Sequence, residues 1–276
     1  MVTREDIRKA AEALGIKKGD TVLIHSSFKS FGGVDGGAES VVGGFMDAVG
    51  EEGTLVFPTL CQEDWEHVYE TWHMDKPSDV GYLTNYFRKL PGAKRSNQAS
   101  HSVAAMGKYA DYITETHGNS GLRYGIFGDT PFAADSPWEK LYELNAKTVF
   151  IGCLMHKCTF RHLIEYKFVE DLLDRIKDTP FHDEAKSKIW CYERWAERGA
   201  WPLTHGEYIR ECLNRENKVS YTKCGDANIM CVCARDYVDC GYENLEKDNY
   251  KALADTLPLY RAWKAEYNAY VEEHNL

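Results

Sequence analysis

A histidine and a carboxylate occur at helical spacing near the middle of the chain. Residues 159–176 contain no Gly or Pro and are rich in Leu, Ile, Glu and Lys, which predicts a helix. Thr159 is expected to cap this helix through its hydroxyl. At about 100° per residue, Cys158, His162 and Glu165 fall within an arc of roughly 60°. The imidazole and the carboxylate therefore share a helix face, where they could act as a general base and its orienting partner.

Three other interpretations of these residues stay open. Cys158 lies one helical turn before His162, so its thiolate could accept an acyl group in a Cys–His pair. His156, Cys158 and His162 could supply three ligands to a zinc ion, although no fourth ligand is evident. A single histidine can also be a hydrogen-bonded structural residue without a chemical role.

The elements before this helix predict a second group of chemically suited residues. Apolar runs at 149–151 and 21–24 predict buried strands, and a loop rich in glycine and serine follows the latter. Glycines let a backbone approach a ligand closely, and the helix expected at 39–49 would offer unpaired N–H groups to an anion. The candidate phosphate-binding residues of this loop are His25, Ser26, Ser27, Lys29, Gly32, Gly33, Gly36 and Gly37. Their spacing matches neither a Walker loop nor a Rossmann fingerprint, so a plain loop stays the alternative.

The segment 61–80 is acidic and aromatic, a make-up typical of loops that line substrate sites. Glu63 and Asp64 are the candidate contacts for an ammonium group, and a solvated acidic loop is the alternative. The first predicted helix begins at a capping box of Thr3 and Asp6 and ends near Leu14. Further helices are predicted at 81–90, 107–117 and 138–144, and further strands at 54–57 and from about residue 102. A helical insertion is predicted at about 177–222 and a helical tail at 244–276.

The totals exclude several classes of protein. The chain has 276 residues and a formal net charge of −10, which argues against binding to nucleic acid or to anionic membrane surfaces and favours a cationic small molecule. No stretch approaches the roughly 18 apolar residues of a membrane span, and the charged N-terminus has no apolar signal core. We therefore expect a cytoplasmic protein.

The nine cysteines are expected to be reduced, because their number is odd and no secretion signal accompanies them. Cys224, Cys231, Cys233 and Cys240 form the one cluster, and its spacing matches no common zinc pattern. Packed or surface thiols are the default interpretation of this cluster, with a structural metal as the alternative.

Seven short segments occur in a fixed order between about residues 25 and 165. They are His25-Ser26-Ser27, Gly36-Gly37-Ala38, Gly50-x-x-Gly53-Thr54-Leu55-x-x-Pro58-Thr59, Pro91-Gly92-Ala93-x-Arg95-Ser96, Ser102-Val103-Ala104-Ala105-x-Gly107, Ser136-Pro137-x-x-x-Leu141, and Ile151-Gly152 followed by Thr159-x-x-His162-x-x-Glu165. In this order they resemble the aminoglycoside N3-acetyltransferases, also called the antibiotic N-acetyltransferase family.

The resemblance implies one α/β domain over residues 1–276, with a mixed central sheet flanked by helices, distinct from the GNAT acetyltransferases. It implies acetyl-CoA as the acetyl donor, no metal, and a homodimer as the expected assembly. The acceptor it implies is the 3-amino group of an aminoglycoside-type antibiotic, acetylated directly in a ternary complex.

The resemblance also assigns roles to residues. His162 would be the general base, Glu165 would orient it, and Thr159 or a nearby N–H could hold the oxyanion. The loop from Ser26 to Gly37 would contact coenzyme A, and Ser102 and Val103 would flank its pantetheine arm.

The sequence departs from the family pattern in places that concern the acceptor. Cys158 stands where the family often has Asn, and Arg95-Ser96-Asn97-Gln98-Ala99 replaces an Arg-Ser-x-His-Pro pattern. Two alternatives therefore stay open. One is an acetyltransferase of the same fold for a different small amine, such as an amino sugar or a natural-product intermediate, and the other is a coenzyme A-binding module without catalysis.

Overall fold

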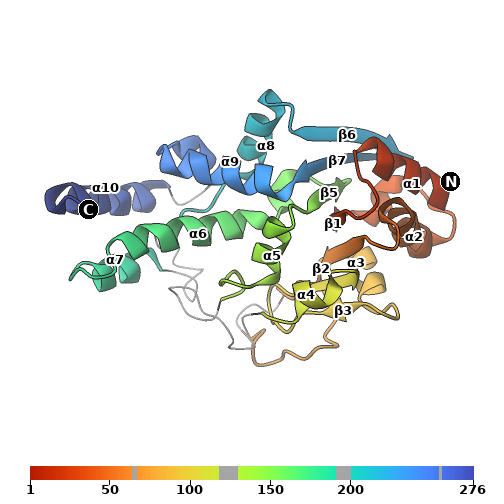
Figure 1. Cartoon of the computed structure of the whole chain (residues 1–276), viewed down its shortest axis with the longest axis horizontal. Coiled ribbons are helices and arrows are strands. Elements are labelled where there is room, and N and C mark those ends of the chain that lie inside the picture. The colour runs from red at the N-terminus through yellow and green to blue at the C-terminus, as the bar shows by residue number, and fades with distance from the viewer. Residues whose placement is uncertain (64–66, 118–129, 191–199, 255–256) are drawn as a thin grey trace.

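The computed structural model describes residues 1–63, 67–117, 130–190, 200–254 and 257–276. Within these ranges seven strands form one sheet in the order β3-β4-β2-β1-β5-β7-β6 (Figure 1). The strands are β1 (Thr21–Ser26), β2 (Thr54–Pro58), β3 (Lys94–Arg95), β4 (Val103–Gly107), β5 (Lys147–Ile151), β6 (Val219–Cys224) and β7 (Ala227–Cys233). β1 pairs in parallel with β2 and β5, whereas the other pairs are antiparallel. The predicted mixed sheet is confirmed.

The central strands bury side chains on both faces of the sheet. On β1, Val22 and Ile24 belong to one hydrophobic core, while Leu23 belongs to the core on the opposite face. Val149 and Phe150 of β5 divide between the two cores in the same way. Burial on both faces explains why these strands are continuous apolar runs in the sequence.

Helices cover both faces, which gives three layers. The first core packs against α1 (Arg4–Ala13), α2 (Gly37–Val49) and α3 (Tyr82–Phe87). The second packs against α4 (Ala110–Thr114), α5 (Pro137–Glu143), α6 (Phe160–Arg175), α8 (Gly206–Arg215) and α9 (Ala234–Glu246). In the described residues, no helix has the length and apolar character needed to cross a membrane.

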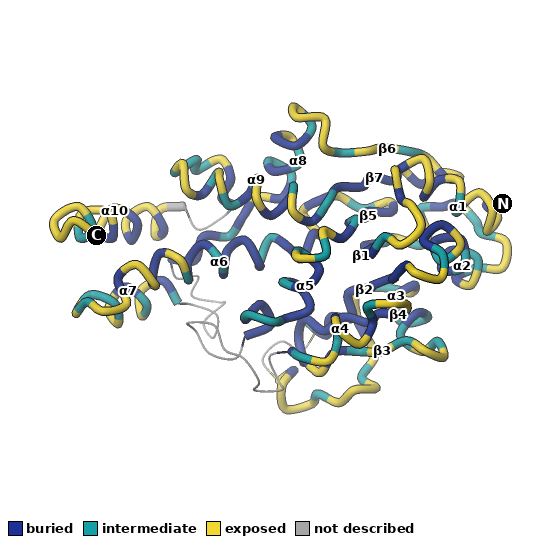
Figure 2. The backbone as a smooth tube through the Cα atoms, in the orientation of Figure 1, coloured by how far each residue is buried: buried dark blue, intermediate teal, exposed yellow. Residues whose placement is uncertain are grey.

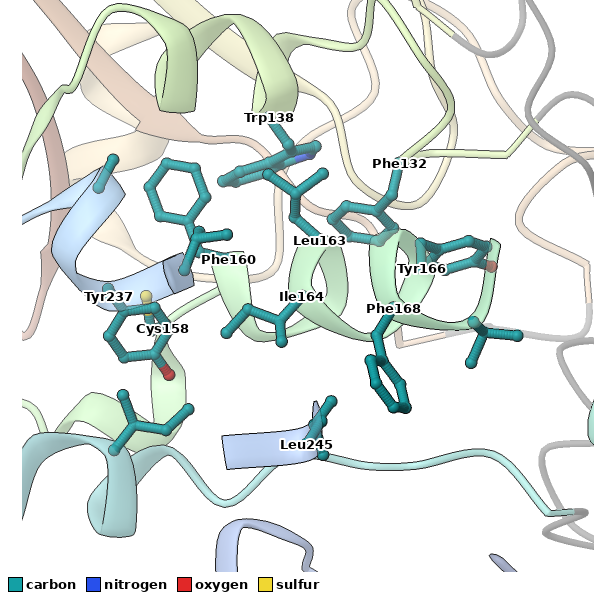
Figure 3. Packing of buried hydrophobic residues seen from close by; sticks show 14 of the residues in the cluster. Phe132, Trp138, Cys158, Phe160, Leu163, Ile164, Tyr166, Phe168, Tyr237 and Leu245 are labelled. Carbon is teal, nitrogen blue, oxygen red and sulfur yellow. The ribbon is translucent and has the colours of Figure 1, made fainter. Parts of the chain in front are cut away.

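The helix α6 has nine buried residues, most of them in the second core. Figure 3 shows Phe160, Leu163 and Ile164 of α6 turned toward neighbours that include Trp138 of α5 and Tyr237 of α9. On α9, Gly241 lies so close to Ile164 that a Cβ atom there would overlap the Ile164 side chain. The absence of a side chain at Gly241 thus allows α9 to pack closely on α6.

The two predicted helix caps have opposite outcomes. At α1 the Thr3 side chain accepts from the Asp6 N–H while the Asp6 carboxylate accepts from the Thr3 backbone N–H, so the predicted capping box is confirmed. The predicted hydroxyl cap of α6 is wrong. Thr159 has helical backbone angles, φ −70° and ψ −22°, and its side chain makes no capping bond. A capping side chain needs an extended backbone, which here belongs to the preceding Cys158.

The remaining elements lie along one side and one end of the molecule. Residues 177–222, expected to be a helical insertion, contain α7 (His182–Ile189), α8 and the first residues of β6. α7 packs beside α10 (Leu257–His274), where Trp263 Nε1 donates to the Ala185 carbonyl at 2.9 Å (Figure 1). The described residues of α7 and α10 are more often exposed than those of α6 (Figure 2). Short 3₁₀ helices are η1 (Phe28–Phe31), η3 (Met155–Lys157) and η5 (Tyr250–Ala252).

Candidate active site

A cleft of about 700 Å³ lies where the parallel strands end. Ser26 ends β1, Pro58 ends β2 and Cys153 follows β5, and all three line the cleft. The chain continues from β1 to β2 on one side and from β5 to β6 and β7 on the other, so the connections after the neighbouring strands β1 and β5 run in opposite directions along the sheet. Such a switch point, at the carboxyl ends of the strands, is where open α/β sheets bind ligands.

His162 and Glu165 meet beside this cleft. Their positions three residues apart on α6 place His162 Nδ1 2.9 Å from Glu165 Oε2, which confirms the predicted shared face. Glu165 is 0% exposed, and Trp201 Nε1, the Thr204 N–H and the Thr204 hydroxyl also donate to its carboxylate, at 3.1, 2.8 and 3.0 Å. Each oxygen of this buried carboxylate thus has a hydrogen-bonding partner.

Burial alone would raise the pKa of the Glu165 carboxyl. The charge and hydrogen bond of His162, with smaller contributions from Arg161 and the Thr204 N–H, nevertheless hold this pKa below its ordinary value. Glu165 is therefore ionised at neutral pH, and a carboxylate can only accept. The proton of His162 must then be on Nδ1, which leaves a lone pair on Nε2.

The second nitrogen of His162 faces Arg161 at the cleft. The His162 side chain is 18% exposed and lines the cleft, and Arg161 Nε donates to His162 Nε2 at 3.4 Å, so Nε2 is an accepting nitrogen. Thr159 and Cys158 also line the cleft. An imidazole with a buried carboxylate on one nitrogen and a lone pair on the other can remove a proton from a bound ligand.

Cys158 is unsuited to the role of a nucleophile. It is 1% exposed and packs beside Tyr237 (Figure 3), and burial raises its pKa to about 12. A thiol at neutral pH is a poor nucleophile and a poor metal ligand. Across the described ranges, no three His, Cys, Asp or Glu residues lie close enough together to hold a metal ion.

The four cysteines near the C-terminus do not converge. Cys231 on β7 belongs to the core beneath α1 and α2, whereas Cys240 on α9 packs against the core of the opposite face. Burial raises the pKa of Cys224 to about 11, and that of Cys231 to about 12, so both stay thiols. The structure therefore places these residues as packed thiols on two sides of the sheet.

Three residues of the predicted cofactor loop line the cleft, and the other five lie elsewhere. His25, Ser26 and Ser27 line the cleft with His162, and burial lowers the pKa of His25 to about 4. The other predicted loop residues do not line it. Gly32 and Gly33 border a separate cavity of about 610 Å³, Gly36 and Gly37 begin α2, and Lys29 is exposed on η1.

Ser102, Val103 and Glu63 do not line the cleft. The Ser102 hydroxyl lies 2.8 Å from the Thr59 hydroxyl and donates to the Thr59 carbonyl at 2.9 Å. Val103 is buried in β4. Glu63 is exposed, with its backbone N–H 2.7 Å from the Asp79 carboxylate. Asp64 lies outside the described residues.

Several cleft residues were not predicted. Gln62, Asp79, His101, Lys157 and Arg161 line it. His101 is 3% exposed, and its ring centroid lies 5.7 Å from that of His162. The signal that could have located His101 is the pairing of β4 with β2. Val103 lies opposite Pro58, which brings the residues just before β4 to the end of β2 and so to the cleft.

The family model described as aminoglycoside 3-N-acetyltransferase matches residues 23–246 of this chain. The chain belongs to this family. The match includes the last four residues of β1, the residues that line the cleft and α9, and it confirms the resemblance carried by the seven segments. The predicted class of enzyme, an acyltransferase of the aminoglycoside N3-acetyltransferase type, is confirmed by the same match.

Two relatives within the aminoglycoside 3-N-acetyltransferase family are similar over most of the chain. The SPbeta prophage-derived aminoglycoside N(3')-acetyltransferase-like protein YokD of Bacillus subtilis is 34% identical over 259 residues, which are 86% of this chain and 90% of that protein. The aminoglycoside N(3)-acetyltransferase III of Salmonella is 30% identical over 280 residues, which are 90% of this chain and 92% of the relative.

Solved structures of the aminoglycoside acetyltransferases share the fold. The crystal structure of Bacillus subtilis YokD has a TM-score of 0.67 at 24% identity and covers 91% of this chain and 95% of its own. AAC-IIIb, solved as a binary complex with CoASH, has a TM-score of 0.67 at 20% identity, covering 89% and 97%. AAC-VIa bound to sisomicin has a TM-score of 0.66 at 19% identity, covering 89% and 98%.

Proposed function

We propose that this chain is an acetyl-CoA-dependent N-acetyltransferase that acylates the 3-amino group of an aminoglycoside-type antibiotic by direct transfer. The observation that carries the proposal is the orientation of His162, with Nδ1 bonded to a buried carboxylate and Nε2 at the cleft. Family membership supplies the acyl chemistry, and relatives named for the 3-amino group supply the acceptor.

The described wall of the cleft fits the donor. Ser26 and Ser27 bring hydroxyls, and Lys157 and Arg161 bring positive charge that suits the phosphates of a nucleotide-containing thiol. Acetyl-CoA, when bound, supplies the acetyl group as a thioester. A similar fold has been solved with CoASH, which supports this donor.

The chain's own residues would move one proton. An alkylammonium has a pKa of about 10. It loses a first proton to water, and the neutral amine that results is the species that attacks. His162 Nε2 would then remove a second proton as the nitrogen bonds to the acyl carbon, with Glu165 stabilising the imidazolium. The C–S bond breaks, and His162 would return its proton to the departing sulfur. Negative charge develops on the acyl oxygen as the nitrogen bonds to the acyl carbon. The Thr159 hydroxyl, which does not cap α6, would donate a hydrogen bond to this oxygen.

One observation favours a second candidate, an acetyltransferase of the same fold for a less charged amine. Among the described residues that line the cleft, Lys157 and Arg161 are cationic and Asp79 is the one acidic residue, while Glu165 is buried behind His162 and bonded to it. A polycationic acceptor would meet more acidic charge in a site built for it.

A panel of acceptors tests the proposal, with release of free thiol from acetyl-CoA as the measurement. Sisomicin, gentamicin and apramycin form one arm, and amino sugars and simple amines form the other. We expect the aminoglycosides to give the highest kcat/KM. Thiol release with another amine alone would overturn the acceptor, and thermal stabilisation by acetyl-CoA without release in either arm would indicate a coenzyme A-binding module.

A further inference from the structure

A second imidazole lies beside the proposed base. His101 is buried just before β4, and its ring approaches that of His162 edge to face, at 5.7 Å and 73°. Phe132 contacts both rings, with centroids 5.0 Å from His101 and 5.5 Å from His162. Both histidines line the same cleft. The mechanism proposed above uses only one of them.

The hydrogen bonds around His101 fix which of its nitrogens carries the proton. The backbone N–H of His101 donates to the Gln98 side chain at 2.5 Å, so the accepting atom must be the amide oxygen. The Ser100 hydroxyl donates to that same oxygen, at 3.3 Å. The Gln62 amide nitrogen, which can only donate, lies 3.1 Å from His101 Nε2, so Nε2 accepts and the Ser100 oxygen accepts at its 2.8 Å contact with Nδ1. The proton of His101 is therefore on Nδ1.

The opposite nitrogen, Nε2, then carries a lone pair. Burial lowers the pKa of His101 well below its ordinary value, and electrostatic repulsion from the neighbouring His162, His117 and Arg161 opposes its protonation further, so the ring stays neutral. Nε2 lies 3.1 Å from the Gln62 amide nitrogen, which can only donate. Gln62 also lines the cleft, and the Asp79 carboxylate holds its backbone N–H.

An attacking amine needs such an acceptor. A neutral primary amine has two N–H bonds besides the lone pair that attacks, and the base removes only one of these protons. The second N–H is buried in the complex and stays on the nitrogen in the amide product, so without an acceptor it weakens the transition state. The two rings are in edge-to-face contact, with centroids 5.7 Å apart, and both line one cleft, which places two imidazoles beside an amine bound there.

We propose that His101 Nε2 accepts the second N–H of the acceptor amine, in the place that the Gln62 amide occupies here, so that two imidazoles seat the reacting nitrogen. His162 takes the proton, and His101 sets the orientation of the nitrogen and the preference for a primary amine. This inference rests on the proposed N-acetyltransferase function.

The experiment compares a primary amine with its derivative monomethylated on the reacting nitrogen, which has no second N–H to offer. The probe is sisomicin, or the panel amine that releases most thiol if sisomicin does not respond. His101→Asn keeps an amide that can bond Ser100 but is too short to reach the cleft, whereas His101→Gln extends an amide to the position of Nε2. His117→Asn is the matched control, because His117 is equally buried, bonded to Ser96 and Pro131, and does not line the cleft.

We expect His101→Asn to lower kcat/KM for the primary amine about ten- to a hundredfold and kcat/KM for the methylated amine far less. The preference, which is the ratio of these two values, should therefore fall. The KM for acetyl-CoA should not change. His101→Gln should restore part of the preference, and His117→Asn should leave it intact.

Two results overturn the inference while the proposed function stands. They are an unchanged preference in an active His101→Asn variant, and equal kcat/KM for the two amines in the wild type, which decides the matter even if the variant does not fold. Absence of turnover with every amine of the panel overturns the proposed function and this inference with it.

Discussion

The ionised state of Glu165 depends on how completely its oxygens are bonded. A buried carboxylate with unmet hydrogen bonds would take up a proton instead. Here His162 occupies one oxygen together with Trp201, and Thr204 donates twice to the other. The carboxylate thus keeps its charge away from water, and that charge keeps the His162 proton on Nδ1.

Loss of either member of the pair should abolish most turnover while donor binding persists. His162→Ala removes the base, and we expect kcat to fall about 10²- to 10⁴-fold. Glu165→Gln keeps the shape but no longer holds the tautomer, and we expect a loss of up to about 10⁴-fold. Steady-state thiol release measures both, and acetyl-CoA at 100 times its Kd should still stabilise each variant by about 2.7 kcal/mol.

The control for this pair is His73→Ala, because His73 is exposed and does not line the cleft. It should turn over like the wild type. Wild-type turnover in His162→Ala would contradict the assignment of the base.

The contact between His162 and Glu165 was predictable, because residues three apart on a helix meet whatever the surrounding fold. The partners Trp201 and Thr204 were not, since they lie 36 and 39 residues beyond Glu165 and no local pattern connects them. His101 was missed for a related reason. Its place beside the cleft follows from the pairing of β4 with β2, which the sequence does not state.

At the scale of elements, the wall of the cleft depends on a close approach of α8 to η3. A Cβ atom on Gly206, the first residue of α8, would lie 2.7 Å from the Met155 carbonyl oxygen and 2.9 Å from the His156 Cα. Both are backbone atoms, which cannot turn aside as a flexible side chain can. η3 carries His156 and Lys157, which line the cleft.

Gly206→Ala should therefore destabilise the fold and disturb the cleft. Overpacking against backbone typically costs about 1–3 kcal/mol, and we expect a loss in this range by urea unfolding, together with a raised KM for acetyl-CoA. Gly43→Ala is the matched control within α2, because its Cβ would meet only the end of the flexible Arg4 side chain. That variant should be neutral or gain up to about 1 kcal/mol from helix propensity. Equal stability of the two variants would contradict the close approach.

The ends of elements were less predictable than their kind. Gly107 was expected to begin a helix, yet it is the last residue of β4, paired with Thr54 at a φ of +119°. A Cβ there would overlap the Gly53 carbonyl oxygen. The glycine is thus required by a neighbouring strand, which a local pattern cannot reveal, and the helix predicted at 107–117 reduces to α4 (Ala110–Thr114).

For the whole molecule, buried neutral histidines link stability to pH. Burial lowers the pKa of His25 to about 4 and that of His117 to about 3, and it lowers that of His101 well below its ordinary value. In the unfolded chain a histidine titrates near about pH 6.5. Below that pH the unfolded state binds protons that the folded state does not, so stability is present above pH 6.5 and is lost as pH falls. The lowered pKa of Glu165 acts in the same direction below its ordinary value of 4.5.

We expect the free energy of unfolding to fall between about pH 6.5 and pH 4, by up to about 1.4 kcal/mol per pH unit for each such histidine. Urea unfolding at several pH values across this window measures the slope. His117→Asn removes one titrating group, so it should reduce the slope by up to about 1.4 kcal/mol per pH unit. This change in slope is separate from any effect of the substitution on stability at neutral pH. A flat profile between pH 7.5 and pH 5 would contradict the burial of these rings.

The sequence predicted an α/β fold with a mixed sheet, but it did not predict all of the strands that form the sheet. The apolar runs identified the central strands, and the ordered segments identified the family, which carries the mixed sheet with it. The antiparallel strands β6 and β7 were not predicted. β6 is largely exposed and lacks the continuous apolar run that identified the central strands, and β7 is an apolar segment with two cysteines that carries no local sign of its pairing with β5.

The bond from the Thr204 backbone N–H to Glu165 also offers a way to observe the pair without any substrate. This amide proton can exchange with deuterium only when the bond to the carboxylate, 2.8 Å long here, opens. Its exchange rate therefore measures how often α6 and the segment at 200–204 separate, and with them how often the imidazole loses its fixed orientation. One backbone resonance would thus record what fraction of the molecules hold the two side chains in register at any moment.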